Sequence, residues 1–199
     1  SQEVVISNED VEAIKNILSN TTDDGQILPI KSVGVQGDAR SYRNLAVISG
    51  KGLDLDWNLV TNKAKEITDK ILTINRVAYI LNANKVDDEI KCFDMKIEDE
   101  CVDLLREIDK IVTTNLETSK ANQTFAVLVP IGITKKYSIA IRTFVTNDFM
   151  TGRPAEIGKE ASKEALANIV KEIEEKFSDK IEFVMYDVTS KPPATCEWQ

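Results

Sequence analysis

A glycine-rich turn is the first stretch of the sequence that could bind a ligand. In GVQGDARSY, Asp38 and Arg40 follow Gly34 and Gly37, which let the backbone turn tightly. An aspartate accepts hydrogen bonds and an arginine donates from a planar fork, so the pair suits a polar ligand. A hairpin turn with a surface ion pair explains the same residues, and their chemistry alone favours that reading.

The final stretch, SKPPATCEWQ at residues 190–199, is the second. Its lysine, Lys191, is a point charge suited to a phosphate, and two adjacent prolines stiffen the backbone beside it. Main-chain N–H groups near Cys196 could add donors, and Glu197 could accept from a sugar hydroxyl. The alternative is an arm whose Trp198 simply packs against the fold.

Two further stretches are weaker candidates. Gln123 is a polar residue just before an apolar run and carries no signal by itself. The stretch RTFVTNDFMTGRP holds Arg142, Asp148 and Arg153 and is interpreted as a polar loop, a kind of segment that often serves ligands or interfaces. A loop that is merely folded onto the protein explains it equally.

The usual catalytic groups are missing. The chain has no histidine, which excludes Ser-His-Asp and Cys-His catalysis within it, and it has no GxxxxGK[ST] or GxGxxG motif. Asp87 and Asp88 could pair as carboxylates, but a solvated face explains their charged run better. Three scattered cysteines form no CxxC pair, so we expect reduced thiols, no metal site and no catalytic residue.

Composition limits the class of protein and its partners. Hydrophobic residues make up 42% of the 199 residues, which is typical of a globular protein, and the net charge is −8. This charge argues against a nucleic-acid partner. No apolar run approaches the ~20 residues of a membrane span, and the first residues lack the pattern of a signal peptide. We therefore expect a cytoplasmic protein with no membrane partner.

The elements that must position these residues occur in the same order twice. Hydrophobic periodicity predicts strand, strand, helix, strand at residues 27–36, 43–50, 55–73 and 74–83, and again at 124–133, 137–146, 159–177 and 180–189. Additional helices are predicted at 8–19 and 97–116. Local residues repeat too: Pro29 and Pro130 both precede isoleucine.

The repetition predicts an α+β fold of two ββαβ modules, each a small, mostly antiparallel sheet covered by a helix. We expect three parts: an N-terminal helix and linker (1–26), a first subdomain with an extra helix (27–120), and a second subdomain with the C-terminal tail (121–199). Packing of the two modules together, or dimerisation, would complete the burial of their small sheets.

Four of these stretches together resemble one family. LPIKSVGVQGDARSY, INRVAYI, RTFVTNDFMTG and YDVTSKPPATCEW are similar, in this order, to the C-terminal dimerisation domain of glutamine-hydrolysing GMP synthetases. The likeness runs from about residue 27 to 199. The doubled arrangement resembles the longer, animal-type members, whose domain has two subdomains. The resemblance implies a domain that binds xanthosine monophosphate (XMP) and forms a homodimer.

The resemblance also implies the site. The family's XMP contacts fall on six residues of this chain: Asp38, Arg40, Gln123, Lys191, Cys196 and Glu197. We expect Lys191 to serve the phosphate and Cys196 to contribute its main chain. The family often has arginine where this chain has Phe183, which puts that contact in doubt. The first module keeps Arg76 at a similar place but lacks a KPP tail, so we expect no second complete pocket.

The rest of the parent enzyme is implied in the same way. Its reaction in purine biosynthesis converts XMP, ATP and glutamine to GMP, which makes the parent a ligase. It uses an ATP pyrophosphatase domain, a glutaminase domain and the cofactors ATP and Mg, none of which this chain contains. By itself the chain is expected not to be catalytic and to need no cofactor. The rival hypothesis is an interaction and dimerisation module that has lost nucleotide binding.

Overall fold

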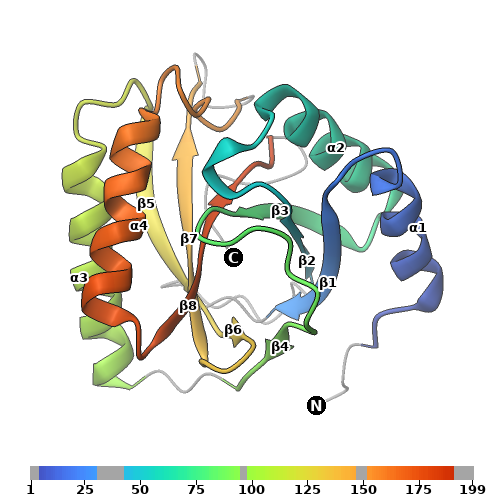
Figure 1. The fold of residues 1–199 in the computed structure, drawn as a ribbon, viewed down its shortest axis with the longest axis horizontal. Helices are drawn as coiled ribbons and strands as arrows, with labels where there is room; N and C mark the ends of the chain where they lie inside the picture. The colour runs from blue at the N-terminus through green and yellow to red at the C-terminus, as the bar shows by residue number, and fades with distance from the viewer. Residues whose placement is uncertain (1–4, 31–42, 95–97, 147–151, 191–199) are drawn as a thin grey trace.

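The computed structural model describes residues 5–30, 43–94, 98–146 and 152–190. Within them the chain forms four α-helices, a short 3₁₀ helix and eight strands (Figure 1). In order these are α1 (Asn8–Leu18), β1 (Asp24–Ile30), β2 (Arg43–Ser49), η1 (Gly52–Asp54), α2 (Trp57–Lys70), β3 (Ile74–Ile80), β4 (Lys91–Cys92), α3 (Asp99–Asn115), β5 (Gln123–Val129), β6 (Ile131–Gly132), β7 (Tyr137–Phe144), α4 (Lys163–Phe177) and β8 (Ile181–Asp187).

The predicted α+β fold with a doubled ββαβ order is confirmed. In each repeat an antiparallel pair, β1–β2 or β5–β7, is followed by a helix that crosses to a parallel strand, β3 or β8. The repeats do not form separate sheets, because β3 and β8 pair antiparallel and give one six-stranded sheet in the order β1-β2-β3-β8-β7-β5. This junction buries strands that would otherwise be sheet edges.

Strand register shows that the two repeats are equivalent position by position. The same cross-strand row occurs in each, as Ile27–Ala46–Val77 and as Leu128–Ile139–Val184. Counting two residues along the first strand from each row leads to Pro29 and to Pro130, so the repeated proline has a structural counterpart. Tyr79 pairs directly with Tyr186 across the junction, which places the approximate two-fold axis between the repeats at this pair.

The prolines lie along the two edge strands of the sheet. Proline has no N–H to give to a ladder and is tolerated at an edge. In the second repeat the strand predicted over 124–133 ends at Val129, and after Pro130 the chain forms the short strand β6, which pairs with β4. The charged segment that holds Asp87 and Asp88 leads into β4 and contains no helix over residues 84–94.

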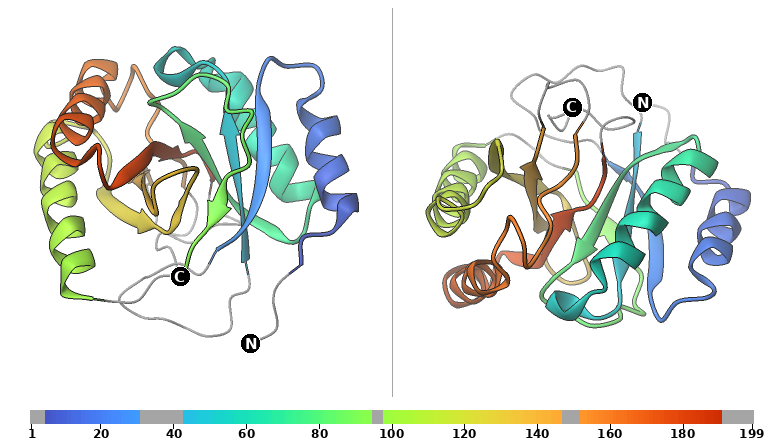
Figure 2. Two further views of the ribbon diagram at one scale, coloured as in Figure 1. Left: turned by 60° about the horizontal axis from the view of Figure 1, so that its bottom comes forward. Right: turned by 90° about the horizontal axis from the view of Figure 1, so that it is seen from above.

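All four helices contribute to a core on one face of the sheet, with α1 and α2 over the first repeat and α3 and α4 over the second. The view from above in Figure 2 shows these two helix pairs on opposite flanks. The other face carries a smaller apolar cluster, which Val86, Ile90 and Ile131 cover from the β3–α3 connection and β6. Within the described residues the helices lie on one face of the sheet, as expected for the repeated ββαβ order.

Each repeat also includes the helix that precedes it. α1 packs on β1 and α2, and α3 packs on β5 and α4. The Asp109 carboxylate of α3 accepts from the Ala126 N–H of β5 at 2.8 Å. The predicted extra helix thus packs on the second repeat. The division into three parts at residues 26 and 120 stays a prediction.

Local sequence sets where the helices begin. The Ser7, Asp56 and Ser162 side chains accept main-chain N–H groups in the first turns of α1, α2 and α4. Because Ser162 is the cap, α4 begins at Lys163, four residues later than the periodicity predicted. None of the helices in the described part of the chain has the length and apolar character needed to cross a bilayer.

Candidate functional site

One end of the sheet gathers the segments that carry the candidate residues. β1, β7 and β8 end here, whereas β2, β3 and β5 begin here, as the pairs Ile30–Arg43, Gln123–Phe144 and Ala78–Asp187 show. We call it the Asp187 end, and the opposite end, where β2 finishes, the Ser49 end. The two ends differ in the charged groups that they hold.

The candidate residues from the sequence are placed only in part. Gln123 is the first residue of β5 and is exposed at the Asp187 end. Asp38, Arg40, Lys191, Cys196 and Glu197 lie outside the described residues. Their described neighbours do not: Ile30 and Arg43 pair where the first segment leaves and rejoins the sheet, and Ser190 follows the end of β8. Three separate stretches therefore start from the same end of the sheet.

Arg142 is not a loop residue, as its place in RTFVTNDFMTGRP had indicated. It lies within β7 with a fully buried side chain. Its guanidinium lies 5.6 Å from the centre of the Phe144 ring, a cation–π distance. Asp148 lies outside the described residues, and Arg153 forms an ion pair with Glu160.

A buried ionic cluster lies at the Asp187 end, where the two repeats meet. The Asp187 carboxylate is 3.1 Å from the Arg76 guanidinium through one oxygen and 3.1 Å from the Arg142 guanidinium through the other. Burial alone would raise the pKa of Asp187, but the two arginines and the N–H and hydroxyl of Thr189 outweigh it and hold the pKa below its ordinary value. Asp187 is therefore an anion at neutral pH.

The same cluster fixes the chain where the tail begins. The Thr189 N–H donates to Asp187 at 2.9 Å, and the Arg142 guanidinium donates to the Thr189 carbonyl at 2.9 Å. From the first repeat, the Val77 N–H donates to the Thr189 hydroxyl at 2.8 Å. These bonds set the position of the backbone two residues before Lys191.

The chain on either side of residues 147–151 is also fixed by hydrogen bonds. Val145 and Arg153 exchange two main-chain hydrogen bonds, of 2.7 and 3.0 Å. The buried Tyr186 hydroxyl donates to the Ala155 carbonyl at 2.6 Å and lies 2.6 Å from the Thr143 hydroxyl. Residues 147–151 lie outside the described residues, and both ends of their connection are anchored on β7 and β8.

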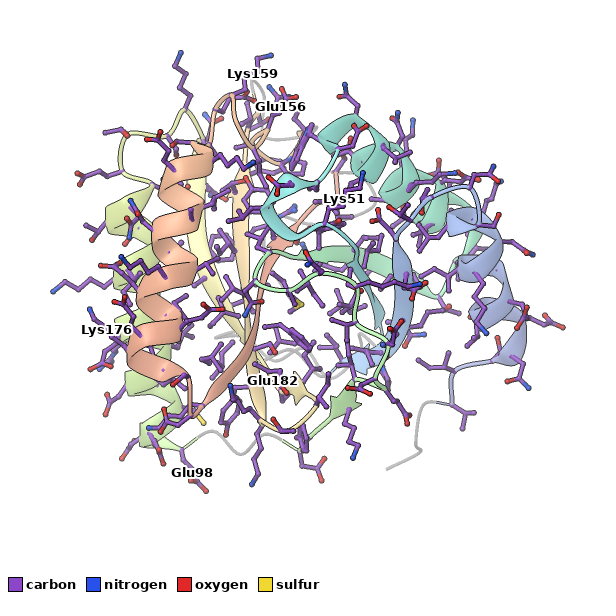
Figure 3. All side chains as sticks on the ribbon, in the orientation of Figure 1. Lys51, Glu98, Glu156, Lys159, Lys176 and Glu182 are labelled. Carbon is purple, nitrogen blue, oxygen red and sulfur yellow. The ribbon has the colours of Figure 1, made fainter. Side chains whose placement is uncertain are left out.

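The Ser49 end holds carboxylates in place of buried arginines. There the Glu182 carboxylate, labelled in Figure 3, accepts from the Ile133 and Thr134 N–H groups at 2.8 and 2.7 Å. Burial would raise the pKa of Glu182, but these N–H groups keep it below its ordinary value. Asp23 lies at the same end beside Tyr79, and burial raises the pKa of this carboxyl. Lys135 lies 3.9 Å from the Glu182 carboxylate at this end.

Phe183 belongs to the Ser49 half of the sheet. It is buried among the apolar residues of the face without helices. The equivalent residue of the first repeat, three positions before Tyr79 as Phe183 is before Tyr186, is Arg76. The two-fold relation therefore places Arg76, and not Phe183, beside the start of the tail. A phenylalanine at position 183 therefore removes no charged side chain from the Asp187 end.

Sequence reasoning missed the role of Arg76, Asp187 and Thr189. A signal was present, because an arginine or aspartate inside an otherwise apolar strand predicts a buried partner. Their meeting depends on the pairing of β3 with β8, which brings together residues more than a hundred positions apart. No local pattern encodes that pairing.

Known proteins match the sequence of this chain over half of its length or more. The chain is 37% identical over 195 residues to a GMP synthase [glutamine-hydrolyzing] of Dictyostelium discoideum, covering 86% of this chain and 26% of that protein. It is 33% identical to a probable GMP synthase of Caenorhabditis elegans, covering 87% and 26%. A GMP synthase of a Marinomonas strain is 36% identical over 52% of this chain and 21% of its own length.

The chain thus spans about a quarter of the length of these curated relatives and matches their C-terminal portion. The family model for the GMP synthase C-terminal domain matches residues 109–198, which run from within α3 through the second repeat and the tail. Residues 109–198 of the chain therefore belong to the GMP synthase C-terminal domain family.

Proposed function

We propose that the chain is the C-terminal part of a glutamine-hydrolysing GMP synthase, in which it binds XMP and takes part in dimerisation. The observation that carries the proposal is the common origin of three candidate segments at the Asp187 end of the sheet. The chain supplies binding and orientation, and the bonds are made and broken by groups elsewhere in the parent protein. ATP, Mg and glutamine would be handled by those other domains.

Strand geometry supports a shared site. Neighbouring strands lie about 4.8 Å apart, so β8 is about 10 Å from β5, where Gln123 begins, and about 14 Å from β1. Asp38 and Arg40 lie five and three residues before Arg43, where β2 begins about 10 Å from β8, so their backbones can extend about 17 and 10 Å from that point. Asp38 and Arg40 can therefore meet Lys191 and Gln123 around one small ligand. A mononucleotide is of this size.

The charges of the two ends support the choice of end. At the Asp187 end two buried arginines flank one carboxylate beside the tail. At the Ser49 end the described charged groups near the junction include Asp23 and the ion pair of Glu182 with Lys135. A phosphate dianion is repelled by carboxylates and favoured by lysine and arginine. The approximate two-fold axis thus relates two ends of which one suits a nucleotide.

Dimerisation is the second part of the proposal. Within this chain the β3–β8 pairing already joins two equivalent repeats, so a homodimer contact would use another surface. Pro29 in β1 and Pro130 directly after β5 disfavour edge-to-edge pairing, and we propose that the helical surfaces form the contact. Sedimentation of the 199-residue chain should give the mass of a dimer; a monomer across the micromolar range would contradict this part.

Replacing Lys191 tests nucleotide binding. In the full-length protein Lys191→Ala should raise the KM for XMP about tenfold or more, because a charge-assisted phosphate contact is lost. Lys176→Ala is the matched control: this exposed lysine, labelled in Figure 3, lies in the last turn of α4, away from the Asp187 end. An unchanged KM for XMP in Lys191→Ala would remove the tail from the site.

A further inference from the structure

The first repeat contributes one charged side chain, Arg76, to the buried cluster that precedes the tail. Arg76, on β3, is 5% exposed and forms its 3.1 Å ion pair with Asp187 on β8. Among the buried charged side chains that the structure describes, Arg142, Glu160 and Asp187 come from the second repeat and Arg76 comes from the first. The ion pair therefore crosses the junction between the repeats.

The ion pair is connected to the tail through Thr189. Arg76 holds one oxygen of Asp187, and the other oxygen accepts the Thr189 N–H. A second contact comes from β3, because Val77, the neighbour of Arg76, donates its N–H to the Thr189 hydroxyl. A shift of the Asp187 carboxylate would thus shift the backbone of Thr189, two residues before Lys191. Buried ion pairs of good geometry hold such positions tightly.

We propose that Arg76 is a positioning residue for the XMP-binding tail. Through Asp187 and Thr189 it fixes the backbone at Thr189, two residues before Lys191. A preorganised tail loses less freedom when a ligand binds, so this contact contributes to affinity without touching the nucleotide. The first repeat, which lacks a KPP tail of its own, serves the site of the second. This inference rests on the proposed function.

The test replaces Arg76 in the full-length protein and separates KM from kcat. Arg76→Met keeps the length and apolar stem of the side chain and removes the ion pair. We expect the KM for XMP to rise about fivefold to tenfold, while the KM for ATP and the kcat at saturating XMP change less than about twofold. Arg76→Lys, which restores the charge, should recover part of the loss.

A matched variant excludes a general loss of stability. Ile67→Ala removes a fully buried side chain from α2, in the same repeat but on the helical face of the sheet. It lowers the fraction of folded protein, which lowers kcat per total protein and leaves the KM for XMP unchanged. If Ile67→Ala raised the KM for XMP as much as Arg76→Met, the positioning role would be refuted.

A milder substitution covers the case in which Arg76→Met does not fold. Thr189→Val keeps the shape of the side chain and removes the hydroxyl that links the tail to Val77; it should raise the KM for XMP about threefold. A rise in Lys191→Ala together with unchanged KM values in Arg76→Met and Thr189→Val refutes this inference and leaves the proposed function standing. Unchanged values in all three variants refute both.

Discussion

The buried carboxylate of Asp187 makes a sharp prediction for stability. Asp187→Asn keeps the size of the side chain and removes its charge, which leaves two buried guanidinium groups without their anion. Removing one partner of a buried ion pair costs about 3–5 kcal/mol. At about 2.1 cal/mol/K per residue, unfolding of the 199-residue chain has an entropy near 0.4 kcal/mol/K, so Tm should fall by about 7–12 °C.

Thermal unfolding followed by circular dichroism at pH 7 measures this shift. Asp54→Asn makes the same chemical change at an ion pair with Lys163 in which the Asp54 side chain is 82% exposed. Exposed pairs contribute little, so this control should move Tm by less than about 2 °C. Equal shifts in the two variants would contradict the assignment of a structural charge cluster at the Asp187 end.

The pH dependence provides an independent check. The pKa of Asp187 is lower in the folded protein than in the unfolded chain, so its stabilisation is complete above the unfolded pKa of about 4 and is lost as the pH falls through the folded pKa. The Tm difference between the original protein and Asp187→Asn should stay constant from pH 7 to 5 and narrow below pH 4. A Tm difference that widens on acidification would show that the pKa of Asp187 is raised, and not lowered, in the folded protein.

Three further substitutions test the framework around the site. Tyr186→Phe removes a buried hydroxyl that donates a 2.6 Å hydrogen bond, and calorimetry should show a Tm about 3–5 °C lower; no change would mean that this bond is not stabilising. Ser162→Ala removes the N-cap of α4 and should cost about 1 kcal/mol in urea unfolding, with Ser178→Ala as the neutral control. At Gly52, with φ +56°, an added Cβ would lie 2.9 Å from the Leu81 carbonyl oxygen, whereas at Gly158, with φ +91°, it would meet no atom within 4 Å. Gly52→Ala should therefore destabilise the protein more than Gly158→Ala.

The order of the elements and their repetition could be predicted from the sequence. Apolar periodicity located each helix and strand of the two repeats, and the paired prolines Pro29 and Pro130 occupy equivalent positions in the structure. The start of α4 was placed too early because the polar residues before Ser162 fit a helical pattern. The hydrogen bond of the Ser162 side chain to the Ala165 N–H decides where the helix begins.

The junction of the repeats was beyond the sequence. Nothing in INRVAYI or IEFVMYDV specifies that β3 pairs with β8, yet this pairing brings Arg76 to Asp187 and makes one sheet of two. The family resemblance pointed to the tail and the glycine-rich turn as site residues. The motifs INRVAYI, RTFVTNDFMTG and YDVTSKPPATCEW contain the residues of the buried cluster, but the resemblance did not indicate that these residues meet.

A structure of the full-length protein with XMP would test the central claim most directly. We predict the nucleotide at the Asp187 end, with its phosphate within hydrogen-bond distance of Lys191 and with Gln123 and the Asp38–Arg40 turn around it. A nucleotide bound at the Ser49 end, beside Glu182, or on the helical face of the sheet would contradict the account.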